Sequence, residues 1–292
     1  MVKSGFCAVV GRANVGKSTL VNQLVGEKVS IVSSKSQTTR HAIKGIVTQE
    51  KGQIIFVDTP GMHKPKNKLD DYMLERIDES LVDMDLILFM VDISQGVGPG
   101  DLFMSKKLPS NVPKLLLLNK IDLIDEKGLL ENKKAIEELG EFNEVIALSA
   151  IIPETVLGLL DKIYDYLPEG PMYYPEDSLT DMSDETLIEE IIREKALHYL
   201  DQEVPHGIAV VLEEYTQEEN GLYMAATIIV ERDSHKGIVI GKGGRKLKGI
   251  GRAARLELVE LFKQPVHLEL WVKVKSDWRR SSHYIKEYGY DK

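Results

Sequence analysis

A glycine-rich octapeptide near the N-terminus has the residue types and the spacing that bind phosphate. Residues 11–18 read Gly-Arg-Ala-Asn-Val-Gly-Lys-Ser, which fits the pattern G-x-x-x-x-G-K-[ST]. The glycines let backbone amides wrap a phosphate, and the start of the following helix adds positive potential. We expect Lys17 to reach the β- and γ-phosphates and the Ser18 hydroxyl to ligate magnesium. Chance would produce the pattern about 0.015 times in a chain of this composition, so a purely structural glycine turn is disfavoured.

Three further short motifs follow, each directly after an apolar run. They are Asp-Thr-Pro-Gly at 58–61, Asn-Lys-Ile-Asp at 119–122 and Ser-Ala at 149–150. Asp58 can hold magnesium through water, the Gly61 amide can sense the γ-phosphate, and Asp122 can accept two parallel hydrogen bonds that guanine offers and adenine does not. One such motif alone is weak evidence for a nucleotide site, because N-K-x-D is usually a charged loop. The phosphate loop and these three motifs in this order are strong evidence. Together they predict a site for GTP and GDP. Its expected contacts are Gly11, Asn14, Val15, Gly16, Lys17, Ser18, Thr19, Asp58, Gly61, Asn119, Lys120, Asp122, Ser149 and Ala150.

Short apolar runs alternate with helix-like stretches over the first 167 residues and would position these motifs. The runs are Phe6–Val10, Ile54–Val57, Leu86–Val91, Lys114–Leu118 and Val145–Leu148. Runs that are apolar on both faces and separated by helices indicate a mostly parallel sheet with helices on both sides. The fold class predicted for residues 1–167 is therefore an α/β phosphate-loop domain, with its ligand at the carboxyl ends of the strands.

The chain changes character after Leu167. Three prolines and one glycine fall within residues 168–175, and we interpret residues 168–183 as an interdomain linker. Ser183 is the expected N-cap of a helix, and the patterns that follow predict the order α-β-β-α-α-β, with a hairpin at 218–221 and an alternating last strand from Val266 to Val274. We assign residues 184–280 to this second, α+β domain and residues 281–292 to a C-terminal tail.

The formal net charge of −9 conceals a strong polarity along the chain. Residues 1–175 carry 20 basic and 24 acidic side chains, residues 176–231 carry 2 and 15, and residues 232–292 carry 15 and 7. The last 61 residues are thus a basic segment of net charge +8, which is typical of nucleic-acid binding. The acidic stretch of net charge −13 lies partly in the same domain as this basic segment. We therefore expect the acidic face of that domain to turn away from RNA.

The remaining composition restricts location. No apolar run reaches the 18 to 20 or so residues that a membrane-spanning helix needs, and no secretory leader is visible, so we expect no integral membrane segment. The single cysteine, Cys7, lies in an apolar run and is expected to be a buried structural thiol in a reducing compartment.

The second domain carries a Gly-Lys-Gly-Gly loop at 241–244. A bare G-x-x-G should occur about twice by chance here, so its place between two helices of this order and the cations around it carry the argument. A loop without side chains lets backbone approach phosphates, while neighbouring cations add affinity and bases are recognised in the adjoining groove. Trp271 and Trp278 could stack on bases, or both could simply pack at the exposed surface. The expected RNA contacts are Ile240, Gly241, Lys242, Gly243, Gly244, Arg245, Lys246, Lys248 and Arg252.

From about Phe6 to Tyr290 the chain resembles the Era family within the translation-factor class of GTPases. The resemblance rests on Ser-Gln-Thr-Thr-Arg-His at 36–41, Asp-Thr-Pro-Gly-Met-His at 58–63, Leu-Pro-Glu-Gly-Pro at 167–171 and Tyr-Pro-Glu-Asp at 174–177. It implies a GTPase domain followed by a type II KH domain. It also implies binding to the 3′ end of small-subunit (16S) ribosomal RNA, a role in assembling the 30S subunit or its precursor, and a bacterial cytoplasmic location with peripheral membrane contact left open.

The resemblance also assigns roles in hydrolysis. Thr39 would contact magnesium and the γ-phosphate, and the expected metal ligands are Ser18, Thr39 and Asp58, the last through water. Met62 stands where signalling GTPases place a water-orienting glutamine, and His63 beside it is expected to be a solvated loop residue. We therefore expect slow turnover with Mg²⁺, and with K⁺ bound near Asn14 as in related GTPases. The expected catalytic set is Lys17, Thr39, Gly61 and Asn14.

Two other functions fit parts of the pattern. A signalling GTPase could use the basic domain to bind protein or an anionic membrane, and a nucleotide-free adaptor could carry a vestigial phosphate loop. Sequence preference across a salt series would separate the first from RNA recognition, and tight GDP binding would eliminate the second.

Overall fold

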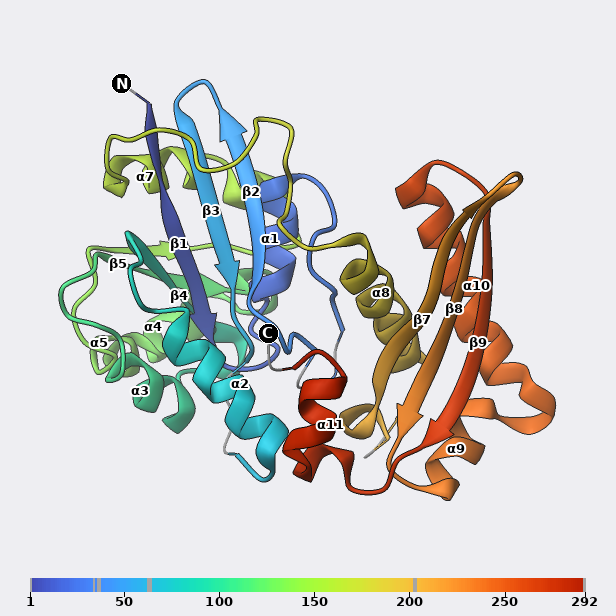
Figure 1. Cartoon of the computed structure of the whole chain (residues 1–292). Coiled ribbons are helices and arrows are strands. Elements are labelled where there is room, and N and C mark those ends of the chain that lie inside the picture. The colour runs from blue at the N-terminus through green and yellow to red at the C-terminus, as the bar shows by residue number, and fades with distance from the viewer. Residues whose placement is uncertain (1, 34, 36–37, 62–64, 202–203, 291–292) are drawn as a thin grey trace. The chain divides into compact units, whose positions relative to one another are not determined.

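The structure is a computed structural model that describes residues 2–33, 35, 38–61, 65–201 and 204–290. The chain divides into two compact units, one built mainly from residues up to Asp181 and the other mainly from Met182 onward. Figure 1 labels the helices and strands of both units. Among the described residues, no helix is long and apolar enough to cross a membrane.

The first unit is built on a six-stranded sheet with the strand order β2-β3-β1-β4-β5-β6. The strands are β1 (Lys3–Gly11), β2 (Ile43–Gln49), β3 (Gly52–Asp58), β4 (Leu86–Asp92), β5 (Lys114–Asn119) and β6 (Glu144–Ala147). Neighbouring strands run parallel except β2, which pairs antiparallel with β3. The five apolar runs coincide with or overlap the parallel strands, so the predicted α/β fold with a mostly parallel sheet is confirmed.

Helices cover both faces of this sheet. Those up to Asp181 are α1 (Lys17–Val25), α2 (Lys68–Glu79), α3 (Pro99–Ser105), α4 (Glu126–Glu131), α5 (Lys133–Glu137), α6 (Pro153–Val156) and α7 (Leu159–Tyr166). Successive residues of β1 enter separate hydrophobic clusters, because strand side chains alternate between faces. Cys7 packs in one cluster with Leu20 of α1, and Ala8 packs in the other with Met104 of α3. Cys7 is fully buried, as expected, and burial raises the pKa of its thiol well above the usual value.

The sequence analysis missed strand β2. Gly45 lies in the middle of this strand, and an interior glycine weakens the strand pattern. A Cβ atom at Gly45 would lie 2.8 Å from Val21 Cγ1 of α1, so the glycine permits close packing of helix and strand. Its role is visible only once α1 is in place.

Residues 168–181, which we predicted to be part of a linker, lie along the first unit. The fully buried Gln53 of β3 accepts hydrogen bonds from the backbone N–H groups of Tyr173 and Tyr174, both at 2.9 Å. Further along, Ile46 of β2 donates its backbone N–H to Leu179 O at 2.8 Å. These contacts anchor the stretch to the sheet, while the exact domain boundaries stay a prediction.

The second unit has the predicted order α-β-β-α-α-β. Its main elements are α8 (Asp184–Tyr199), β7 (Ala209–Glu218), β8 (Gly221–Val230), α9 (Asp233–Ile240), α10 (Arg245–Phe262) and β9 (Val266–Val274). Ser183 Oγ accepts a hydrogen bond from Thr186 N, so the expected N-cap of α8 is confirmed. Strand β8 pairs antiparallel with β7 and parallel with β9, and the hairpin between β7 and β8 lies where predicted.

Two features of the second unit differ from the sequence interpretation. The stretch treated as a tail contains a further helix, α11 (Ser282–Glu287). Trp278 is fully buried, donates its indole N–H to Gly207 O at 2.9 Å, and contacts the rings of Tyr288 and Tyr290. It therefore packs internally and is not available to stack on bases.

Candidate functional site

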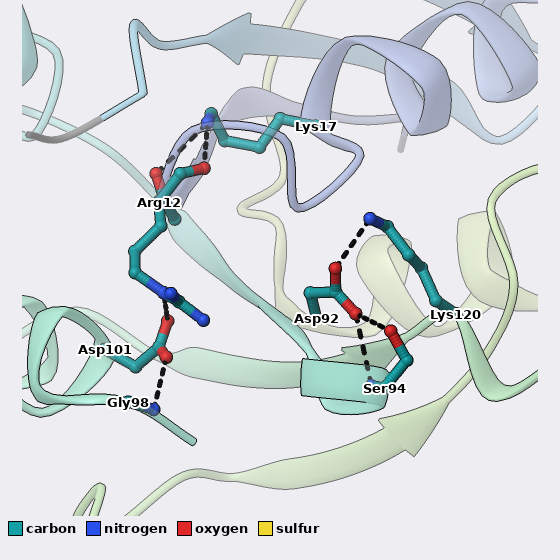
Figure 2. A network of polar contacts seen from close by, with 8 residues as sticks. Arg12, Lys17, Asp92, Ser94, Gly98, Asp101 and Lys120 are labelled. Atoms are coloured by element: carbon teal, nitrogen blue, oxygen red, sulfur yellow. Dashed lines mark hydrogen bonds and ion pairs between the residues drawn. The ribbon is translucent and has the colours of Figure 1, made fainter. Parts of the chain in front are cut away.

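The phosphate loop connects the end of β1 to the start of α1. Gly16 has a φ of 105° and Asn14 a φ of 64°, both in the left-handed region. A Cβ atom at Gly16 would lie 2.4 Å from Asn119 Nδ2, so only glycine fits there. The buried Lys17 donates from Nζ to Gly11 O at 3.1 Å and to Arg12 O at 2.9 Å (Figure 2). The loop thus holds its lysine against its own first two carbonyl groups.

The ammonium group of Lys17 is strongly affected by its surroundings. Burial lowers its pKa to about 8, and the carboxyl of Asp58 opposes that shift. A nearby anion favours the charged form of such a lysine, and nucleotide phosphates are anions of this kind.

Three oxygen-bearing side chains converge beside the loop. Ser18 Oγ donates to Asp58 Oδ2 at 2.6 Å and lies 2.9 Å from Thr39 Oγ1. Asp58 is fully buried, and its Oδ1 has no hydrogen-bond partner within the part of the chain that the structure describes. Burial raises the pKa of the Asp58 carboxyl, with Lys17 and Ser18 opposing. Magnesium prefers oxygen ligands of this kind, so the residues fit the ion expected here.

The glycine of the Asp-Thr-Pro-Gly motif lies against the phosphate loop. A Cβ atom at Gly61 would lie 2.5 Å from Ala13 Cα, so a larger residue would displace loop backbone. Thr59 of the same motif donates its hydroxyl to Val9 O of β1 at 2.9 Å and ties the motif to the sheet. Met62 and His63, which the sequence analysis discussed for water activation, lie outside the described residues.

Asn119 connects the phosphate loop to the Ser149-Ala150 motif. Its Nδ2 donates to Val15 O at 2.6 Å and its Oδ1 accepts from Ala150 N at 2.9 Å. Thr155 Oγ1 accepts from Ser149 N at 2.9 Å and supports the second of these loops. The sequence analysis missed Thr155, because it lies beyond the motif and only the turn brings its hydroxyl back to it.

The other members of the Asn-Lys-Ile-Asp motif differ in exposure. Lys120 has a φ of 65°, and its Nζ contacts Asp92 Oδ2 at 2.6 Å (Figure 2). Asp92 Oδ1 in turn accepts from the N–H and hydroxyl of Ser94. Asp122 is exposed and so is accessible to a base. Asp92 was not among the predicted site residues, although a carboxylate at the end of a parallel strand was a signal.

The glycine loop of the second unit joins α9 to α10. Gly241, Gly243 and Gly244 have φ values of 70°, 63° and 75°, which glycine adopts without strain. Cβ atoms at Gly243 and Gly244 would meet nothing within 4 Å, so this part of the loop faces open space. The side chains expected to contact RNA along it are exposed or half-buried. Ile240 and Lys246 are half-buried, while Lys242, Arg245, Lys248 and Arg252 are exposed.

The apolar run before this loop lies in a helix. Ile238, Val239 and Ile240 form the last turn of α9, with Val239 fully buried and Ile238 42% exposed. Trp271 on β9 is 47% exposed, in contrast to the buried Trp278. Of the two tryptophans, only Trp271 has the accessibility that stacking on a base requires.

Comparisons with known proteins match both units. The family described as 50S ribosome-binding GTPase matches residues 6–120, and the KH domain family matches residues 203–279. The chain is 49% identical to GTPase Era of Alkaliphilus metalliredigens over 292 residues, covering 99% of each chain. It is 48% identical to GTPase Era of Clostridioides difficile over 295 residues, covering 100% of this chain and 99% of the relative.

Two solved Era structures resemble the whole chain. A variant of Aquifex aeolicus Era bound to GDP·AlF4⁻ has a TM-score of 0.95 at 41% identity and covers 99% of both chains. Era in complex with MgGDPNP and nucleotides 1506–1542 of 16S ribosomal RNA has the same TM-score and coverage at 42% identity. The phosphate loop, the three following motifs and the glycine loop therefore occur in a chain that belongs, over its full length, to the Era family of GTPases.

Proposed function

We propose that the chain is a nucleotide-controlled RNA-binding protein of small-subunit assembly. It binds GTP and GDP at the phosphate loop, and its second domain binds the 3′ end of 16S ribosomal RNA in the 30S subunit or its precursor. The observation that carries the proposal is the presence of both sites in one chain whose full length resembles an Era protein bound to MgGDPNP and to a 16S fragment.

The nucleotide half of the proposal rests on contacts between distant motifs. Hydrogen bonds and close packing bring Ser18, Thr39 and Asp58 together and place Asn119 beside Val15. Bound magnesium would be held by the hydroxyls and, through water, by Asp58. It would neutralise phosphate charge during hydrolysis. Lys17 would bind the β- and γ-phosphates, and Asp122 would recognise guanine.

The RNA half rests on the glycine loop and its charge. Gly243 and Gly244 leave open space beside the backbone, and exposed cations flank them. Backbone can therefore approach a phosphate where a side chain would collide. The basic residues supply the salt-dependent part of the affinity.

The paired change Lys242→Asp with Gly243→Asp tests RNA recognition. We expect binding to an oligonucleotide of the 16S 3′ end to be lost, while GTP hydrolysis by the protein alone is retained. The matched control is Lys273→Asp with Ser276→Asp, which alters net charge by the same amount at positions of the same domain outside the glycine loop. Unchanged RNA affinity in the loop variant, or equal loss in the control, would contradict the assignment of the loop.

The same oligonucleotide separates RNA recognition from general attraction to anions. The intact protein should prefer the 16S sequence over a scrambled one at every salt concentration. Binding to vesicles of anionic lipid should instead weaken as the salt concentration rises, because it rests on charge alone. Stronger binding to vesicles than to RNA at physiological salt would favour the membrane-binding alternative. We place the protein in the bacterial cytoplasm, where its ribosomal target is made, with contact at the inner membrane face as an outcome of the vesicle assay.

Hydrolysis is proposed to be slow and to depend on a monovalent cation near Asn14. We expect faster turnover in potassium chloride than in sodium chloride. Asn14→Gly should abolish this difference, because glycine adopts the left-handed φ of 64° without a side-chain oxygen. Equal rates of the unmodified protein in both salts would refute the role of the cation.

A further inference from the structure

The side chain of Arg12 extends from the phosphate loop to the start of α3. Its Nε donates to Asp101 Oδ1 at 2.8 Å, and the other carboxylate oxygen of Asp101 accepts from Gly98 N at 2.8 Å (Figure 2). Asp101 is fully buried, whereas 32% of the Arg12 side chain is exposed. A buried carboxylate with both oxygens occupied in this way gives Arg12 a single well-defined position.

One of the two glycines beside Pro99 makes room for this arginine. A Cβ atom at Gly100 would lie 2.7 Å from Arg12 Cδ, and one at Gly98 would lie 3.6 Å from Arg12 Nη1. Gly98 and Gly100 flank Pro99 at the start of α3. The stem of Arg12 therefore crosses the first turn of α3 at a distance that Gly100 allows and alanine would disturb.

The ion pair holds the first half of the phosphate loop, and a different contact holds the second half. Arg12 O accepts from Lys17 Nζ at 2.9 Å, so the residue that contacts Asp101 also supplies a carbonyl on which the phosphate-binding lysine rests. Beyond the turn, Val15 O accepts from Asn119 Nδ2 at 2.6 Å. The residues between these two contacts include Asn14, whose φ is in the left-handed region. A loop fixed at both ends loses less conformational entropy when it closes around phosphate.

We propose that Arg12 and Asp101 are positioning residues for nucleotide binding, which act as one unit by holding the phosphate loop against α3. The inference rests on the proposed nucleotide site. In this proposal the pair acts on the nucleotide indirectly. It acts through the Arg12 main chain and through Lys17, and its loss should accelerate nucleotide release.

Dissociation of a fluorescent GDP derivative from Arg12→Gln, Asp101→Asn and the double variant tests the proposal. We expect each single variant to release the nucleotide about tenfold faster, since a charge-assisted hydrogen bond contributes about that much. The double variant should be close to the single variants, because the second change removes a contact that is already lost. If the release rate of the double variant rises by the product of the two single-variant effects, the claim that the residues act as a unit is overturned.

Two milder variants cover the case in which an unpaired Asp101 disrupts folding. Arg12→Lys keeps the charge but lacks the Nε–H, so its rate should fall between those of the unmodified protein and Arg12→Gln. Gly100→Ala leaves both charges in place and displaces the arginine stem, so it should also accelerate release. Thermal unfolding of each nucleotide-free variant distinguishes a purely structural role of the pair from a positioning role. A lower melting temperature with an unchanged GDP release rate would refute positioning.

Two controls complete the test. Lys127→Gln removes an exposed ion pair with Glu131 and should leave the release rate unchanged. Lys17→Ala reports on the nucleotide site itself. If Lys17→Ala binds GDP as tightly as the unmodified protein, the proposed nucleotide site is wrong. If Lys17→Ala weakens binding while the Arg12 and Asp101 variants do not, the site stands and the positioning role is refuted.

Discussion

Replacing Asn119 by alanine removes a side chain that joins the phosphate loop to the Ser149-Ala150 loop through both of its polar atoms. Its amide donates to Val15 O and accepts from Ala150 N, and all three residues are at most 3% exposed. The variant leaves a buried carbonyl and a buried N–H without partners. The nucleotide-free protein should therefore be destabilised in addition to losing contacts to a ligand.

The size of the effect follows from these two orphaned groups. Each buried polar group left unsatisfied costs about 1–3 kcal/mol, so Asn119→Ala should lose about 2–6 kcal/mol of unfolding free energy. For a unit of this size, about 4 kcal/mol lowers the melting temperature by about 8–16 °C. Asn119→Asp keeps the acceptor for Ala150 N but places an oxygen against Val15 O, so at neutral pH it should be at least as unstable as the alanine variant.

Acid should partly rescue the Asn119→Asp variant. Burial raises the folded-state pKa of the introduced carboxyl, so the folded state binds the proton more tightly, and stability relative to Asn119→Ala falls as pH rises through that pKa. Once protonated, the introduced carboxyl can donate to Val15 O as the native asparagine does.

Calorimetry without nucleotide is the suitable assay, because both tryptophans, at 271 and 278, lie outside the first unit. Asn132→Ala is the control. Its half-buried side chain donates to Gly128 O at 2.9 Å, and its loss should cost about 1 kcal/mol. An Asn119→Ala protein within about 1 kcal/mol of the unmodified protein would refute the reasoning, and so would an Asn119→Asp variant that is insensitive to pH.

Three further predictions concern other parts of the chain. Because burial lowers the pKa of Lys17 to about 8 and bound phosphate would raise it, GDP binding should take up a proton above pH 8, and Kd should then rise by up to about tenfold per pH unit; a flat profile up to about pH 9.5 would contradict this. Gln53→Leu should free the backbone N–H groups of Tyr173 and Tyr174, destabilise the first unit by about 2–3 kcal/mol and accelerate their hydrogen exchange, and unchanged protection would count against it. Trp278→Ala should cost the second unit about 3–5 kcal/mol by denaturant unfolding followed by circular dichroism, whereas Trp271→Ala at a half-exposed position should cost less than about 1 kcal/mol; similar losses would contradict the difference in burial.

Local sequence patterns were sufficient to predict much of the fold. The parallel strands appeared as apolar runs because both faces of such a sheet are buried, and the phosphate loop was recognisable because few residue types place amides around a phosphate. The order of elements in the second unit was also predicted correctly. Strand β2 was missed because Gly45 interrupts its pattern, and α11 was missed because its short sequence lacks a clear apolar period.

The contacts that hold the site together could not be predicted from local sequence patterns. Nothing near Arg12 in the sequence indicates that its partner is Asp101, and nothing near Lys120 indicates Asp92. Each partner belongs to a different βα connection, and the sheet brings the connections together. Trp278 shows the same limit, since the sequence suggested stacking or packing at the exposed surface, whereas the residue is fully buried and donates to Gly207 O.

By itself, the sequence determined the chemistry available to this protein. It specified a phosphate loop, an Asn-Lys-Ile-Asp motif that predicts guanine recognition, a glycine loop within a basic segment and the two kinds of fold that carry them. The tertiary structure decided which side chains position that chemistry. It placed Asn119 between two loops, Arg12 on Asp101, and residues 168–181 along the first sheet. The physical reason is that a motif is encoded by neighbours in the chain, whereas a buried hydrogen bond between remote residues depends on packing that no local pattern records.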